Sequence, residues 1–341
     1  MKEINYLKEN GKIDLIAPSF GCTTEPYATR LDAAIKNLKK IGFKVKEGPN
    51  VRLAKGNLRS NTAKKCAEEF NEAYKSNSNF IISVGGGETM CEILPYIDFE
   101  MCKNLPHKFF MGFSDNTNLT YTLCTISEVS TIYGPCAPSF AFINEKGFSP
   151  LKDSLALAMK KTKKLKGYPK WLKESDHELS AQKPLMKFKY DQKKVLKVVS
   201  KDGEFKVNGR LLGGCLDCLV NLCGTKFDKT KEYIEKYKKD GFVWFIEACD
   251  LSPVGIERAL FQLKEAGWFK YAKGFIFGRP LHFDEIFGDL DRIKAVKIGL
   301  KGIKAPYVLD VDLGHFDPSI PIICGEMCEI SVKKGNIYFK Y

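Results

Sequence analysis

The stretch Phe80-Ile-Ile-Ser-Val-Gly-Gly-Gly87 is a short apolar run that stops at three glycines. Such a run predicts a buried strand followed by a turn. The next apolar run, Phe109–Phe113, stops in the same way at Ser114. Helical spacing of apolar residues appears between such runs, as in Tyr27–Ile41 and Thr62–Ser76. Strands that alternate with helices predict a mostly parallel sheet covered on both faces, with the ligand beyond the carboxyl ends of its strands.

The second half of the chain has a different pattern. Val195–Val207 predicts a hairpin around Lys201-Asp-Gly, and Gly209–Gly214 predicts a glycine-rich turn. Two runs near the end of the chain, Glu326–Val332 and Asn336–Lys340, flank Lys-Lys-Gly and predict a second hairpin. We therefore expect the second half to be richer in β-structure than the first.

The length of 341 residues exceeds what one ordinary core holds, so we expect two domains. The predicted division is an N-terminal α/β domain over 1–165, a connection over 166–190 and a smaller β-rich α/β domain over 191–341. The connection is lysine-rich and long. Connections of that length inside compact proteins are usually functional or linkers.

The net charge of +13 raises the question of a nucleic-acid partner. Only seven of the 54 basic residues are arginine, the residue that phosphate and base readers favour, so we expect a lysine-coated surface and no nucleic-acid partner. No apolar run approaches the roughly 20 residues that span a bilayer, and the N-terminus lacks a signal-peptide pattern. The expected location is cytoplasmic, with the 12 cysteines reduced.

Ser114 and the glycine loop are the first candidates for chemistry. A serine between a strand and a helix exposes its hydroxyl and stands beside backbone N–H groups that favour negative charge. Asn116 replaces the second glycine of the usual nucleophile turn, and an ordinary helix cap is the commoner explanation for a serine at such a place. Gly85, Gly86 and Gly87 are compatible with an oxyanion hole, a phosphate cradle or a tight turn.

Glu247 and His315 are the second pair of candidates. Glu247 ends the predicted strand Phe242–Glu247, and His315 follows the predicted strand Pro306–Val311 closely. Together with Ser114 they supply a nucleophile, a base and a carboxylate, the components of acyl transfer. Cys215-x-x-Cys218 has no partner pair at zinc spacing, so no metal is expected.

These residues lie in segments that resemble the L,D-carboxypeptidases, the family of serine peptidases that also contains the microcin C immunity proteins. The matching segments occur in the family's order and cover nearly the whole chain: Ile13-Asp-Leu-Ile-Ala-Pro-Ser, Val84-Gly-Gly, Gly112-Phe-Ser-Asp-Asn-Thr, Gly209-Arg-Leu-Leu-Gly-Gly, Phe245-Ile-Glu-Ala, Gly274-Phe-Ile-Phe-Gly-Arg-Pro and Gly314-His-Phe-Asp-Pro.

The resemblance implies a Ser–His–Glu triad of Ser114, His315 and Glu247, with the backbone N–H groups of Gly86 and Asp115 as the oxyanion hole. It further implies a nucleophile domain followed by a domain that brings the base and the acid. It also implies a cytoplasmic homodimer without metal or organic cofactor.

Two branches of the family differ in substrate. The murein-recycling branch trims a terminal D-alanine, and the immunity branch cuts an amide between an amino acid and a nucleotide-like group. The long connection with Trp171 resembles the immunity branch, where an aromatic ring stacks on a purine, although a packing role explains Trp171 equally well. Gly85 and Trp171 are the expected substrate contacts, and Cys249 and Asp250 depart from the family pattern.

Two other classes of function stay open at this point. Gly85-Gly-Gly-Glu-Thr resembles the phosphate loop of NAD and lipid kinases, which predicts a phosphotransferase, although Gly87 stands where that loop carries Asp. A basic nucleic-acid-binding module is the third class, and it predicts steeply salt-dependent binding.

Overall fold

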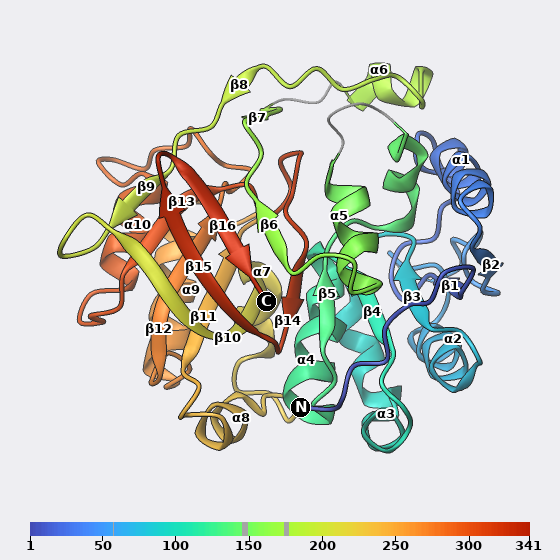
Figure 1. Cartoon of the computed structure of the whole chain (residues 1–341), viewed down its shortest axis with the longest axis horizontal. Coiled ribbons are helices and arrows are strands. Elements are labelled where there is room, and N and C mark those ends of the chain that lie inside the picture. The colour runs from blue at the N-terminus through green and yellow to red at the C-terminus, as the bar shows by residue number, and fades with distance from the viewer. Residues whose placement is uncertain (57, 145–148, 174–176) are drawn as a thin grey trace. The chain divides into compact units, whose positions relative to one another are not determined.

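The computed structural model describes residues 1–341 except 57, 145–148 and 174–176. The chain forms two compact units (Figure 1). Unit 1 consists of Met1–Thr162, Glu174–Lys189 and Pro321–Ile323, and unit 2 of Lys163–Lys173, Tyr190–Ile320 and Cys324–Tyr341. The chain therefore passes between the units more often than the expected division into 1–165, 166–190 and 191–341.

Unit 1 is built on a sheet with the strand order β14-β5-β4-β3-β1-β2. The bounds are β1 Lys12–Ile16, β2 Lys44–Glu47, β3 Phe80–Ser83, β4 Phe109–Gly112, β5 Thr131–Tyr133 and β14 Ile322–Cys324. Strands β2, β1, β3, β4 and β5 pair in parallel. Strands β3, β4 and β5 are buried along their whole length, which explains why their sequences are continuous apolar runs.

Two groups of helices pack around this sheet. One group contains α1, η3 and α5, and the other contains α2, η1, α3 and α4. The bounds are α1 Tyr27–Lys40, α2 Ala63–Lys75, η1 Met90–Tyr96, α3 Phe99–Asn104, η2 Ser114–Asn116, α4 Thr117–Ser127, η3 Ala137–Phe142, α5 Ser149–Ala158 and α6 His177–Gln182. Thr62 caps α2 by accepting a hydrogen bond from the Lys65 N–H.

Unit 2 is built on a mixed sheet with the strand order β6-β16-β15-β10-β11-β12-β13-β9. The bounds are β6 Lys164–Lys166, β9 Lys197–Val199, β10 Phe205–Cys215, β11 Phe242–Glu247, β12 Ala272–Gly278, β13 Tyr307–Val311, β15 Met327–Lys333 and β16 Asn336–Lys340. Strands β10 to β13 are parallel, and antiparallel strands flank them on both sides. The predicted C-terminal hairpin is confirmed by the pairing of β15 with β16.

The helices of unit 2 follow its parallel strands. Their bounds are α7 Leu216–Leu222, α8 Thr230–Lys236, α9 Pro253–Glu265 and α10 Arg292–Gly299, and a small ribbon of β7 Lys170–Trp171 and β8 Gln192–Lys193 lies outside the main sheet. Ser252 caps α9, and Pro253 occupies its first turn, where a missing N–H costs nothing. Within the described residues, no helix is long and apolar enough to cross a bilayer.

Two local predictions are wrong. Val195–Val207 does not form a hairpin, because β9 pairs with β13 and β10 pairs with β11 and β15. Gly209–Gly214 is not a turn but part of β10. A Cβ at Gly213 would lie 1.8 Å from the Phe245 carbonyl oxygen, so the glycine permits close approach of two strands. The predicted α/β class, with a mostly parallel first sheet and a β-rich second unit, is confirmed.

Candidate active site

Ser114 occupies a strained turn in unit 1. It follows β4 directly and opens η2, which runs into α4. Its φ is +63°, a left-handed conformation that residues with a Cβ rarely adopt. Its backbone N–H donates to the Tyr133 hydroxyl at 3.1 Å. Strain of this kind persists where the surroundings enforce it and is concentrated at functional sites.

The glycine loop packs directly against this turn. A Cβ at Gly86 would lie 3.2 Å from the Ser114 Cβ and 3.3 Å from its Oγ. Asn116 links the two segments, because its amide group donates to the carbonyls of Gly85 and Phe113, each at 2.9 Å. These two bonds explain why an asparagine stands where the usual nucleophile turn has a glycine, because the Asn116 side chain holds the glycine loop in place.

Asp115 links the turn to Ser19, which follows β1, and to Met90, which begins η1. Its buried carboxylate accepts hydrogen bonds from the Ser19 hydroxyl at 2.6 Å and the Met90 N–H at 2.9 Å. Asn118 donates to the same carboxylate at 3.0 Å. Burial raises the pKa of Asp115, and these three hydrogen bonds act in the opposite direction. A Cβ at Gly87 would lie 2.1 Å from the Ser19 Oγ, so the loop admits no side chain there.

Glu247 and His315 form a hydrogen-bonded pair in unit 2. Glu247 ends β11, and His315 follows β13. The His315 Nδ1 lies 2.8 Å from the Glu247 Oε2, and Glu247 is 2% exposed. Two glycines leave room for this carboxylate, since a Cβ at Gly314 would lie 2.5 Å from Oε2 and one at Gly278 2.8 Å from the Glu247 Cβ. Gly314 also has a φ of +103°, which favours glycine independently.

The surroundings of His315 favour its charged form. Burial by itself would lower the pKa of the imidazole. The negative charge of Glu247 and the hydrogen bonds to Cys249 and Glu247 outweigh that effect, so the pKa is raised well above its ordinary value. A carboxylate that orients an imidazole and stabilises the imidazolium is what a general base needs during acyl transfer.

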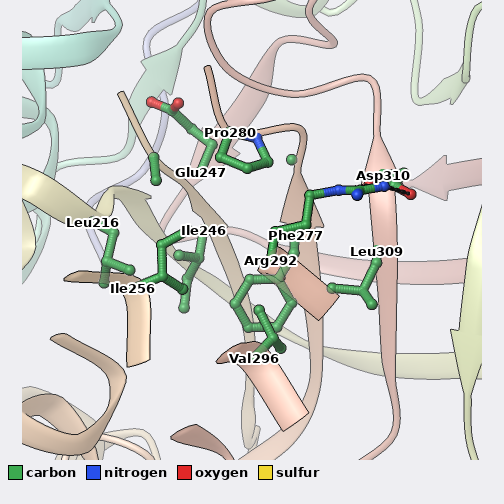
Figure 2. A pocket seen from close by; sticks show the side chains of 12 residues that line it. Leu216, Ile246, Glu247, Ile256, Phe277, Pro280, Arg292, Val296, Leu309 and Asp310 are labelled. Carbon is green, nitrogen blue, oxygen red and sulfur yellow. Dashed lines mark hydrogen bonds and ion pairs between the residues drawn. The ribbon is translucent and has the colours of Figure 1, made fainter. Parts of the chain in front are cut away.

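A small cavity of about 20 Å³ lies beside Glu247 and is walled mainly by apolar side chains, among them Leu216, Ile256 and Val296 (Figure 2). The Arg292–Asp310 ion pair stands at its far side, with an Nη2 to Oδ2 distance of 2.8 Å. In Figure 2 the Glu247 carboxylate points away from this pair, and it is bonded to His315.

Asp217 holds the segment that follows Glu247. Its carboxylate accepts the backbone N–H of Cys249 at 3.0 Å and that of Asp250 at 2.9 Å, and the Cys215 thiol donates to it at 3.3 Å. Asp217 comes from the first turn of α7, and Cys215 lies opposite Glu247 in the register of β10 and β11. The ends of two neighbouring strands are therefore joined beside the acid–base pair.

The indole ring of Trp171 takes part in internal packing. It is 5% exposed and lies 5.2 Å, between ring centroids, from both Phe283 and Phe316. The Arg279 guanidinium lies 4.6 Å from the centroid of the indole ring. The indole N–H donates to the Lys193 carbonyl. Phe316 is the neighbour of His315, so this cluster supports the segment that carries the base. The predicted substrate contact of Trp171 stays a prediction.

The structure thus brings the predicted site residues together in two groups. Gly85, Gly86, Ser114 and Asp115 adjoin one another in unit 1, and Glu247 and His315 are bonded in unit 2. The sequence did not indicate the roles of Tyr133 and Asp217 or the clearance at Gly278 and Gly314. Of these, the two glycines had a signal, since both lie in the motifs that carry the family resemblance. Among the described residues, no group of three His, Cys, Asp or Glu side chains is placed to hold a metal ion.

Comparison with known proteins shows that the chain is a serine-type carboxypeptidase. Residues 13–134 match the LD-carboxypeptidase N-terminal domain, and residues 208–330 match the LD-carboxypeptidase C-terminal domain. The chain therefore belongs to the LD-carboxypeptidase family, as the motifs predicted.

Both branches of the family appear among the relatives. The Microcin C7 self-immunity protein MccF of Escherichia coli is 28% identical over 317 residues, which cover 90% of this chain and 87% of the relative. A probable murein peptide carboxypeptidase of Bacillus subtilis is 24% identical over 338 residues, which cover 94% of this chain and 90% of the relative.

Solved structures share the fold across the whole chain. MccF in complex with aspartyl sulfamoyl adenosine matches with a TM-score of 0.81 at 23% identity, covering 99% of this chain and 98% of that protein. Muramoyltetrapeptide carboxypeptidase from Oxalobacter formigenes matches with a TM-score of 0.70 at 21% identity, covering 96% and 97%.

Proposed function

We propose that this carboxypeptidase hydrolyses an amide at the C-terminal end of a peptide or a peptide–nucleotide conjugate through Ser114, His315 and Glu247. The observation that carries the proposal is the 2.8 Å bond between the His315 Nδ1 and the buried Glu247 carboxylate. In the proposed mechanism the other ring nitrogen of His315, Nε2, transfers the proton. A carboxylate-oriented imidazole has this role in serine hydrolases.

The proposed reaction assigns one role to each residue. Ser114 attacks the carbonyl carbon, and His315 takes its proton and later gives it to the leaving amine. Glu247 holds the imidazole and stabilises the imidazolium. The backbone N–H groups of Gly86 and Asp115 donate to the oxyanion. The close packing of Gly86 on Ser114 supports this last assignment.

The relatives support two chemical classes of substrate. The murein peptide carboxypeptidases are named for peptides of the cell wall, and MccF has been solved with aspartyl sulfamoyl adenosine. Both classes present an amide beside a free or masked carboxyl terminus. We propose that the site cleaves this amide and that the chemistry of the leaving group decides between the branches.

The test is a side-by-side incubation with a muropeptide tetrapeptide and an aspartyl sulfamoyl adenosine, read by mass spectrometry. We expect one of them to lose its C-terminal amino acid or its nucleoside part. The matched control is Ser114→Ala under the same conditions. Cleavage of neither substrate, or equal cleavage by the control, would overturn the proposal.

The remaining expectations concern specificity and assembly. For Trp171 and Gly85 we propose substrate contact, which Trp171→Phe tests by a higher KM for the nucleotide conjugate with an unchanged KM for the tetrapeptide. A homodimer and a cytoplasmic location are further predictions. Light scattering coupled to size-exclusion chromatography checks the first, and fractionation of the source cells checks the second.

A further inference from the structure

Strand β13 contains a bulge shortly before the segment that carries His315. In the pairing of β12 with β13, Ile276 lies opposite Val308. The next pair is Gly278 with Val311, so two steps along β12 correspond to three along β13. Asp310 falls within this interval and has a φ of +63°, a left-handed conformation. An extra residue of this kind bends a strand and re-aims the residues that follow it.

The residues that follow the bulge lie against Glu247. A Cβ at Gly278 would lie 2.1 Å from the Leu313 carbonyl oxygen, and one at Gly314 would lie 2.5 Å from the Glu247 Oε2. The His315 Nδ1 bonds the same carboxylate oxygen at 2.8 Å. A shift of one residue in a strand turns each later side chain to the opposite face. The extra residue in β13 therefore decides which residues of this segment meet Glu247.

Arg292 holds the bulge from the first turn of α10. Its Nε lies 3.1 Å from the Asp310 Oδ1 and its Nη2 lies 2.8 Å from Oδ2, and both side chains are largely buried (Figure 2). Its Nη1 donates to the Phe283 carbonyl at 3.3 Å, and the guanidinium lies 3.7 Å from the centroid of the Phe283 ring. A positive charge is unfavourable at a helix N-terminus, so α10 itself gives no reason for an arginine at this position.

The sheet gives Asp310 little support. Strand β9 pairs with β13 from Tyr307 to Leu309, and the pairing of β12 with β13 resumes at Val311. Within the described residues, Asp310 therefore has no partner residue in either neighbouring strand. A buried ion pair is weak evidence for stability, and its best-attested use is to fix register. The contact with Arg292 is thus suited to holding the extra residue in place.

We propose that Arg292 and Asp310 are positioning residues for the base, because their ion pair holds the β13 bulge that brings His315 to Glu247. The pair acts through the strand, since the Glu247 carboxylate points away from it and is bonded to His315 (Figure 2). The effect of the pair on hydrolysis rests on the proposed function, whereas its effect on the position of His315 does not.

Arg210 and Asp240 provide a matched control pair in the same unit. The Arg210 Nε lies 3.1 Å from the Asp240 Oδ2, and Arg210 is buried. Arg210 lies opposite Phe242, which begins β11, whereas Glu247 ends that strand. Loss of either ion pair removes the same kind of interaction from unit 2, but the control pair lies at the other end of β11 from the acid.

The first experiment needs no substrate. The full chain is prepared with isotopically labelled histidine, and the imidazole signals are followed by NMR as the pH is changed, with His315→Gln to assign the signal of His315. Burial lowers the pKa of His315 and the charge of Glu247 raises it, so a base displaced from Glu247 has a lower pKa. We expect Asp310→Ala and Arg292→Ala both to lower this pKa, and Asp240→Ala to leave it unchanged.

The two alanine variants change the local charge in opposite directions. Loss of a carboxylate by itself lowers the pKa of a nearby imidazole, whereas loss of a guanidinium by itself raises it. A fall in both variants therefore reports displacement of His315. A rise in Arg292→Ala, or no change in either variant, would overturn the proposal. If an alanine variant does not fold, Arg292→Lys, which keeps the charge but loses the fork of two nitrogens, is measured in the same way, and a fall is again expected.

The second experiment measures hydrolysis by the same variants. We expect kcat to fall by about 10–100-fold in Asp310→Ala, the usual effect of a misplaced catalytic group, with KM little changed. Asp240→Ala should keep the native kcat, and urea denaturation of both variants compares their stability. Equal kcat values for the two variants would overturn the catalytic part of the proposal. Absence of turnover in the native chain would instead contradict the proposed function, and the NMR titration would still decide whether the ion pair positions His315.

A third variant tests the conformation of the bulge. Asp310→Gly lacks the carboxylate just as Asp310→Ala does, but glycine adopts the left-handed conformation without strain. We expect its kcat to exceed that of Asp310→Ala by about fivefold or more. A glycine variant no more active than the alanine variant would overturn the role of the bulge.

Discussion

The nucleophile turn (residues 112–116) and the acid–base pair (Glu247 and His315) are held in place by different means. The turn depends on backbone geometry: Ser114 has a φ of +63°, and a Cβ at Gly112 would lie 2.5 Å from the Asn116 Cγ. The pair depends on side-chain electrostatics, with a carboxylate that is 2% exposed and bonded to an imidazole. The turn should therefore keep its conformation when the Ser114 hydroxyl is removed. In the Glu247–His315 pair, a substitution of either residue should change the protonation of the other.

Substitution of Ser114 should have the largest effect on rate and little effect on folding. Ser114→Ala removes the nucleophile, so we expect kcat to fall by about 10⁴–10⁶-fold. Ser114→Gly should be equally inactive. Its free energy of unfolding should exceed that of Ser114→Ala by about 1 kcal/mol, because glycine adopts positive φ without strain. Rate assays and urea denaturation measure the two effects. A glycine variant less stable than the alanine variant would contradict the assignment of strain to this residue.

Glu247→Gln should have the next largest effect and should alter the pH profile. The amide keeps the shape of the side chain but loses the charge, and kcat should fall by about 10³–10⁴-fold. With that charge gone, burial dominates and the pKa of His315 falls. The acidic limb of the kcat/KM profile, where the base must be neutral, should therefore move to lower pH. A limb that stays in place would show that Glu247 does not set the protonation of His315.

Two glycine-to-alanine variants compare the two regions directly. Gly314→Ala places a Cβ 2.5 Å from the Glu247 Oε2 in a left-handed conformation, so we expect a loss of about 1–3 kcal/mol in unfolding free energy. Gly86→Ala makes a 3.2 Å contact with the Ser114 Cβ and should cost less stability. Urea denaturation of both variants checks the order. A reversed order would mean that the turn is less tolerant than the pair.

Asp217→Asn should have the smallest effect. Asparagine keeps one acceptor oxygen for the N–H groups of Cys249 and Asp250 but turns the other position into a donor. We expect kcat to fall by about 2–10-fold, which corresponds to one hydrogen bond. Asp202→Asn, an exposed turn substitution in the same unit, is the control. Equal rates for the two variants would remove Asp217 from the support of the pair.

The sequence is informative where one residue type has one physical use. Apolar runs that end at Ser114 and Glu247 predicted both strand ends, because parallel strands buried on both faces are mostly apolar. Glycines were ambiguous: Gly213 permits close approach of strands where a turn was expected. The hydrogen bonds from Cys249 and Asp250 to Asp217 join segments far apart in the chain, so no local pattern indicated them.

Strand β14 has a consequence for biosynthesis. It contributes Ile322–Cys324 to the edge of the unit 1 sheet beside β5, whereas the other strands of that sheet come from the first part of the chain. While the ribosome is still translating unit 2, β5 has an unpaired edge, and such edges invite pairing with other chains. Unit 1 can therefore close its sheet only after residues 322–324 have been synthesised, long after the rest of its strands.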